Sequence, residues 1–217
     1  MKSLKSRVIG YVVVLVGCAL LAGCATNAPK DYSNFQASAP KSILILPPIN
    51  ESVDIAGTYS CLSTMSLPIA EMGYYVFPVE VVDRLLKENG FSQPVEMHQI
   101  PVDRLRAFTG ADAVLYPVVK EYGSKYQVIA STTKVHMSAR LVDAKTGTDL
   151  WTSNVAVERG SSDYSQAGLV GQLLGVVLEQ VINSKTDPAN QLSAQASVQM
   201  FSDPKEGLLR GPYRPVQ

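Results

Sequence analysis

Few residues in this 217-residue chain could carry out chemistry, since it contains only two histidines and three cysteines. His98 falls in a segment, residues 91–101, that we predict as a loop, and His136 falls on the polar side of a predicted strand. No HxxxH, CxxC or HExxH spacing is present, and no GxSxG or Walker motif. The sequence therefore predicts no catalytic residue, no metal site and no cofactor.

Cys24 carries the strongest chemical signal. Residues 1–23 begin with lysines and an arginine, continue as an apolar segment and end in Leu-Ala-Gly, the pattern of a lipoprotein signal peptide cleaved before Cys24. The apolar segment, Val8–Leu20, is shorter than the about 20 residues of a membrane span. We expect Cys24 to be acylated and to bind the chain to a lipid bilayer. A transmembrane anchor and ordinary secretion are the alternatives.

The residues after Cys24 indicate where the chain is delivered. Ala25 stands where an Asp would favour retention in the inner membrane of Gram-negative bacteria, so we expect the outer membrane, on its periplasmic face. Residues 24–40 are polar and small, which predicts a flexible tether. Without the three basic residues of 1–23, the chain has 16 Lys and Arg against 19 Asp and Glu. This balance argues against nucleic acid as a partner and against a general binder of anionic lipid, but it leaves room for a local basic patch.

A glycine-rich stretch, GLVGQLLG at residues 168–175, resembles a nucleotide-binding fingerprint only superficially. It lies inside a predicted amphipathic helix over 166–183 rather than between a strand and a helix, so the dinucleotide interpretation fails. Gly168, Gly171 and Gly175 lie on nearly one helix face, where they allow close backbone approach. They predict either packing on the domain's own sheet or an interface in a homo-oligomer.

The first half of the chain predicts strands that alternate with helices. An aliphatic run that ends in two prolines predicts a strand buried on both faces at 42–50. Further strands are expected at 74–80 and from Ala113, and helices at 57–72, 79–90 and 102–110. Cys61, in the first of these helices, is expected in the core. This order is typical of an α/β domain with helices packed on a sheet.

The next segment changes to a period of two. Apolar and polar residues alternate over 132–158 around a turn that contains Gly147, which predicts an antiparallel hairpin with one wet face. We therefore expect a single α/β domain at 41–184 with a mixed β-sheet and flanking helices. Residues 185–217 are rich in turn formers and predict an extended C-terminal arm, with room for a short helix at 191–200.

Three motifs in order carry a resemblance to a known fold. SILILPPIN, ADAVLYPVV and ARLVDAKTGTDLW resemble strands of the TolB amino-terminal domain, of the curli-secretion lipoprotein CsgG and of LpoB. The whole chain resembles a family of Gram-negative outer-membrane lipoproteins that share the lipobox, the PPIN strand end and a tail like LLRGPYRP. The resemblance implies a TolB-like α/β domain.

The resemblance also implies a function. It suggests a protein-binding accessory subunit of a CsgG-like secretion or envelope-assembly complex, with a CsgG-like or other envelope protein as partner. An LpoB-like regulator of peptidoglycan synthesis is the first alternative, and a periplasmic enzyme the second. The hairpin at 132–158 carries several charges, so a membrane pore built by this chain alone is not expected.

Overall fold

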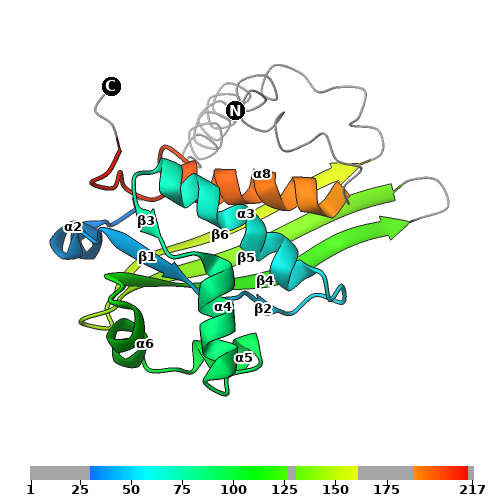
Figure 1. The fold of residues 1–217 in the computed structure, drawn as a ribbon. Coiled ribbons are helices and arrows are strands. Elements are labelled where there is room, and N and C mark those ends of the chain that lie inside the picture. The colour runs from blue at the N-terminus through cyan, green and yellow to red at the C-terminus, as the bar shows by residue number, and fades with distance from the viewer. Residues whose placement is uncertain (1–29, 127–130, 161–187, 215–217) are drawn as a thin grey trace, which may run out of the picture. The chain divides into compact units, whose positions relative to one another are not determined.

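Six strands form one mixed sheet in the computed structural model (Figure 1). The structure describes residues 30–126, 131–160 and 188–214. The sheet order is β3-β1-β4-β5-β6, with β2 also paired to β4; β1 is parallel to β3 and β4, and β4, β5 and β6 are antiparallel. This is the predicted α/β class with a mixed sheet. The strands are β1 (Ser42–Ile45), β2 (Ile49–Asn50), β3 (Tyr75–Val76), β4 (Ala113–Tyr126), β5 (Ser131–Asp143) and β6 (Asp149–Gly160).

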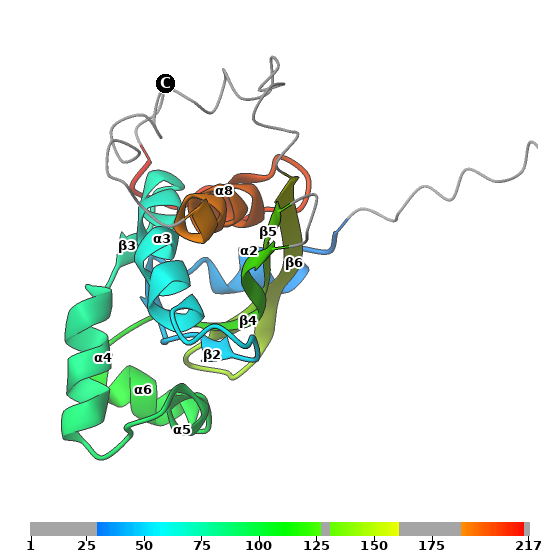
Figure 2. The same cartoon turned by 90° about the vertical axis from the view of Figure 1, so that its right-hand side faces the viewer.

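Helices cover both faces of this sheet. Figure 2 shows α3 and α8 side by side on one face, and α4, α5 and α6 as a separate group. β1 lies between the two groups: Ile43 and Ile45 pack in the core under α3 and α8, whereas Leu44 and Leu46 pack under α4–α6. The predicted burial of this strand on both faces is confirmed. The helices are α2 (Ser33–Ser38), α3 (Gly57–Glu71), α4 (Val79–Glu88), α5 (Pro94–His98), α6 (Val102–Thr109) and α8 (Pro188–Ser202).

The predicted hairpin is β5 with β6. Their register pairs Val135 with Val157 and Leu141 with Trp151, which places the apolar members of both strands on the face under α8. The opposite face of β5 and β6 carries polar side chains that are exposed or half-buried. The period of two therefore predicted both the pairing and the buried side, because only one face of this hairpin is covered.

Within the arm expected at 185–217, the short helix expected at 191–200 is present as part of α8, but the segment packs on the domain instead of extending from it. α8 places Leu192, Met200 and Phe201 in the main core, and the Phe201 ring lies 5.8 Å from that of Trp151. Ser193, Ala196 and Ser197 are fully buried where α8 contacts α3, and Thr64 bonds the Ser197 hydroxyl at 2.8 Å. Small residues at this contact let the two helices approach closely, so a weakly apolar segment completes the core.

Two further expectations differ from the structure. Residues 33–38, expected within the flexible tether, form α2, whose Phe35 is 3% exposed. Residues 94–98, expected as loop, form α5, because Pro94 suits the first helical position and the Glu96 carboxylate accepts bonds from the Ser92 and Gln93 N–H groups. His98 thus ends a helix.

Cys61 is buried as expected, and burial raises the pKa of its thiol to about 12.

Candidate functional site

The connection between β2 and α3, Glu51–Ala56, has an unusual surface for a polar loop. Val53 is 99% exposed and Ile55 is 91% exposed, the highest values among the large apolar side chains of the described residues. Single exposed aliphatics are common on protein surfaces. Here two β-branched side chains protrude from one short loop, and we call them the apolar tip.

Hydrogen bonds fix the backbone under this tip. The Asn50 amide donates to the Asp54 carbonyl at 2.7 Å, and its oxygen accepts from the Ser52 N–H at 2.9 Å. The Asp54 carboxylate accepts from the Ala56 N–H, and the Asp54 carbonyl accepts from the Gly57 N–H. Asx bonds of this kind replace the regular ladder at a strand end. The polar side chains of the loop are therefore used to hold the loop backbone in one conformation.

Close contacts with β4 hold the same loop in place. The Glu51 N–H bonds the Val119 carbonyl at 2.8 Å. Gly123 adopts φ +116°, and a Cβ built there would lie 3.3 Å from the Asp54 carboxylate. Glycine suits this backbone conformation and this close approach. The apolar tip is thus displayed on a rigid support, which lowers the ordering cost of binding a partner.

The apolar tip lies at one end of the sheet, which we call the loop end. The opposite end, here the tether end, consists of α2, the turn between β5 and β6 and the C-terminal segment Asp203–Arg214 (Figure 1). β4 connects the two ends, since Ala113 pairs with Asp143 and Gly123 lies against Asp54. Ten residues of strand span about 33 Å. The two ends are therefore separated by most of the length of the sheet.

A shallow cavity of about 350 Å³ lies where α5 meets the sheet, lined by residues that include His98, Tyr116, Ser138, Arg140 and Thr152. The Arg140 guanidinium lies 5.0 Å from the Tyr116 ring centre and is paired with Asp149 at 3.1 Å. The His98 Nε2 atom bonds the Pro47 carbonyl at 2.9 Å. Burial lowers the pKa of His98, the Pro47 bond opposes this, and Arg140 lowers it further. Each of these polar groups already has a partner within the domain, and we therefore assign them a structural role.

His136 lies on the polar sheet face, as predicted. Its Nδ1 atom is 3.6 Å from the Glu121 carboxylate, which Lys134 contacts at 2.7 Å, and its Nε2 atom is 2.7 Å from the Asn154 side-chain oxygen. Across the described residues, no group of three or more His, Cys, Asp or Glu is placed to hold a metal ion. None of the helices in the described part of the chain has the length and apolarity of a membrane span.

The residues singled out from the sequence are not those that form this surface. Cys24, Gly168, Gly171 and Gly175 lie outside the described residues, as does the helix predicted over 166–183. No motif of the sequence analysis falls on residues 51–56, so Val53 and Ile55 were missed. The available signal was the pair of β-branched residues, Val53 and Ile55, in the short segment between Asn50 and Gly57.

The fold and the loop define the class of protein: an α/β domain with an open mixed sheet and a rigid, apolar surface loop. The chain belongs to the family described as "Putative lipoprotein GNA1162-like", whose model matches residues 30–213. It is 40% identical over 211 residues to "Putative lipoprotein NMB1124/NMB1162" of Neisseria meningitidis serogroup B, and the match covers 96% of each chain. The resemblance to a lipoprotein family is therefore confirmed.

A solved structure agrees with this assignment. The crystal structure of lipoprotein GNA1162 from Neisseria meningitidis is 43% identical, has a TM-score of 0.57, and covers 67% of this chain and 100% of that chain. The LpoB C-terminal domain from Salmonella enterica is 19% identical with a TM-score of 0.41, and covers 66% of this chain and 92% of that chain. A likeness at the LpoB level carries no argument about function.

Proposed function

We propose that this chain is a protein-binding lipoprotein, held at the outer membrane by acylated Cys24 on the periplasmic face. It acts without catalysis, by presenting the apolar tip to an envelope protein. The observation that carries the proposal is the rigid display of Val53 and Ile55, since a fixed and fully exposed aliphatic pair suits a pocket on a partner.

The length of the tether supports a nearby partner. The folded domain begins at α2, so only residues 25–30 separate Cys24 from Asp31. Fully extended, the seven steps between these two residues span at most about 25 Å. Anchoring of this kind raises the local concentration of the domain near other membrane-bound proteins. A CsgG-like secretion or envelope-assembly complex in the same membrane fits this reach better than an enzyme deep in the cell wall.

Site-specific photo-crosslinking in cells tests the proposal. A photoreactive amino acid replaces Ile55 in the full chain, and the matched control carries it at Val81, which is 61% exposed on α4. We expect position 55 to crosslink an identified envelope protein and position 81 to crosslink none. The identity then decides the partner: a CsgG-like protein supports the accessory-subunit role, and a peptidoglycan synthase supports the regulator instead.

Two crosslinking results would contradict the proposed role of the apolar tip. If position 55 gives no crosslink while position 81 gives one, the apolar tip is not the binding surface. A crosslink from position 55 to a second copy of this chain would make the tip a subunit interface, in line with the homo-oligomer that the glycines at 168, 171 and 175 suggest. A second variant, Val53→Ser with Ile55→Ser, removes the apolar contact and keeps the loop bonds, since these come from Asn50, Ser52 and Asp54.

A further inference from the structure

We propose that the tether end is a membrane-facing surface that docks on phosphate-bearing lipid headgroups and so points the apolar tip away from the bilayer. This inference rests on the lipid anchor of the proposed function and adds a defined orientation. Only residues 25–30 lie between Cys24 and Asp31, and these seven steps reach at most about 25 Å, so the tether end stays close to the headgroups.

The start of the folded domain is fixed to the C-terminal segment. The Tyr32 hydroxyl donates to the Gly207 carbonyl at 2.6 Å, and the Tyr74 hydroxyl donates to the Leu209 carbonyl at 2.6 Å. The Gly211 and Tyr213 N–H groups bond the Met72 and Gly73 carbonyls at 2.8 and 3.0 Å. The tether therefore enters a rigid surface, and whatever this surface displays is held near the bilayer.

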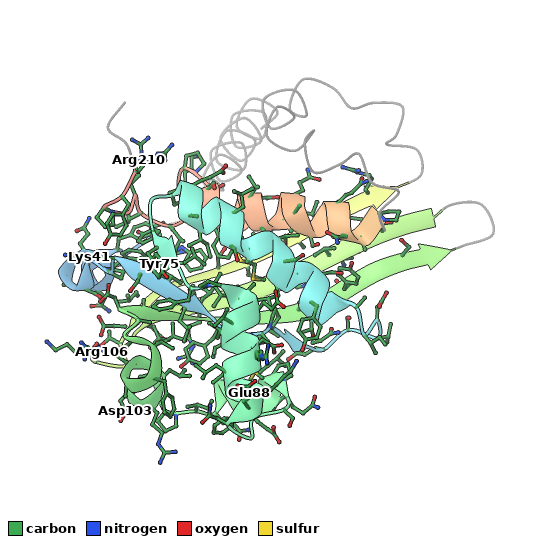
Figure 3. The ribbon with its side chains drawn as sticks, in the orientation of Figure 1. Lys41, Tyr75, Glu88, Asp103, Arg106 and Arg210 are labelled. Carbon is green, nitrogen blue, oxygen red and sulfur yellow. The ribbon has the colours of Figure 1, made fainter. Side chains whose placement is uncertain are left out.

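That surface displays cations and aromatic rings. Lys41, Lys205 and Arg210 are exposed, and Figure 3 shows Lys41, Tyr75 and Arg210 at the same end of the domain. Tyr75 is 52% exposed and Tyr213 is 63% exposed. Lysine and arginine attract lipid phosphates, and tyrosine prefers the level of the headgroups. This combination differs from the loop end, where the most exposed large side chains are the aliphatic Val53 and Ile55.

Carboxylates moderate the attraction. Asp31, Glu71 and Glu206 are exposed at the same end and equal in number the three cations named above, so the net charge of these six groups is zero. Such a surface would not hold a protein on a bilayer from free solution. With the lipid anchor in place the surface only has to choose one orientation, and weak contacts suffice because the tether supplies the effective concentration. The apolar tip then faces outward, about 33 Å beyond the tether end.

The test uses the full-length acylated protein on vesicles of phosphatidylethanolamine and phosphatidylglycerol. An environment-sensitive dye is attached at Tyr213→Cys or, as the control position, at Ile55→Cys, and headgroup spin-labelled lipid quenches it. Cys61 does not react, since it is buried and burial keeps its pKa near 12. We expect the dye at 213 to lose most of its fluorescence and the dye at 55 to lose none.

Neutralising the surface provides the second variant. Lys41→Gln with Arg210→Gln should shift the ratio of docked to undocked domain about thirtyfold toward undocked, the equivalent of about 2 kcal/mol for two cations. The control, Arg84→Gln with Lys120→Gln, removes two exposed cations elsewhere and should change nothing. Equal quenching at 213 and 55, or stronger quenching at 55, overturns the orientation. Failure of the protein to float with vesicles overturns the lipid anchor itself, and with it the orientation.

Discussion

The two ends of the domain use similar loop chemistry for opposite purposes. At the tether end, bonds from Tyr32, Tyr74 and the turn at Gly73 attach the C-terminal segment and bury its apolar residues. At the loop end, bonds from Asn50 and Asp54 fix the backbone while Val53 and Ile55 remain exposed. Rigidity at the first end supports the fold, and rigidity at the second supports binding. An exposed apolar residue is therefore informative only when its backbone is fixed.

The largest expected effect concerns the anchor that makes the two ends different. Cys24→Ser should abolish incorporation of labelled palmitate and remove the protein from the outer-membrane fraction, because the acyl chains supply the membrane affinity. Metabolic labelling and density-gradient fractionation measure both. The matched control is Cys18→Ser, a change within residues 1–23 that should leave acylation intact. Palmitate retained on the Cys24→Ser protein would contradict the assignment of the modified residue.

Truncation of an apolar side chain to alanine should lower the free energy of unfolding strongly at the tether end and very little at the loop end. Phe201→Ala removes a fully buried ring packed on Trp151, and we expect a loss of about 3–5 kcal/mol of unfolding free energy. Ile55→Ala removes an exposed side chain and should cost less than about 0.5 kcal/mol. Urea denaturation of both proteins gives the comparison. A small effect at Phe201 would return the C-terminal residues to the status of a loose arm.

Sequence reasoning succeeded where a pattern has a single structural meaning. The alternation in 132–158 predicted the pairing of β5 with β6 and the buried face of this hairpin. The aliphatic run 42–50 predicted the burial of β1 on both faces. α3, α4 and α6 follow from apolar spacing and from the glycines that end them. In these elements the local pattern and the tertiary environment agree.

It failed where the tertiary environment alone decides. The helix expected at 191–200 is present within α8, but its place in the core was not predicted. Ser193, Ala196 and Ser197 on its buried side give little apolar signal, although they allow the close contact with α3. Phe35 is one ring in a polar stretch, and only the packed domain shows that it is buried. The candidate surface was missed for the converse reason, because a sequence does not reveal that Val53 and Ile55 point outward from a fixed loop.

Two glycines with similar backbone conformations allow the effect of the contact between Gly73 and the C-terminal segment to be separated from backbone strain. Gly73 has φ +96°, and a Cβ there would lie 2.5 Å from the Arg214 nitrogen; Gly90 has φ +92° with nothing within 4 Å. Gly90→Ala should cost about 1–2 kcal/mol from backbone strain alone. Gly73→Ala should cost about 1–3 kcal/mol more, since the segment must move.

Hydrogen exchange distinguishes local detachment from a general loss of stability. In Gly73→Ala, the amides of Gly211 and Tyr213 should exchange faster because their bonds to Met72 and Gly73 are disturbed. In Gly90→Ala, the same amides should stay as protected as the rest of the core. Equal unfolding free energies for the two variants would mean that the contact at Gly73 adds nothing to the tether end.

A small, pH-dependent effect is expected at the turn between β5 and β6. Burial raises the pKa of Asp143, but hydrogen bonds from the Ser38 hydroxyl and from the Thr146 and Lys145 N–H groups outweigh it and hold the pKa below its usual value. A lowered pKa in the folded state means stability that is present above the unfolded value of about 3.9 and is lost as pH falls through the folded value.

Asp143→Asn should therefore cost about 1 kcal/mol near neutral pH, from weaker bonds to an uncharged acceptor. The difference from the parent protein should shrink as pH falls below about 4, because the parent then loses the same charge. Chemical denaturation at a series of pH values measures this, with Asp103→Asn on the exposed side of α6 as the control. A loss of unfolding free energy that does not change with pH would mean that only the shape of the Asp143 side chain matters. The carboxylate charge would then not contribute to holding α2 at the tether end.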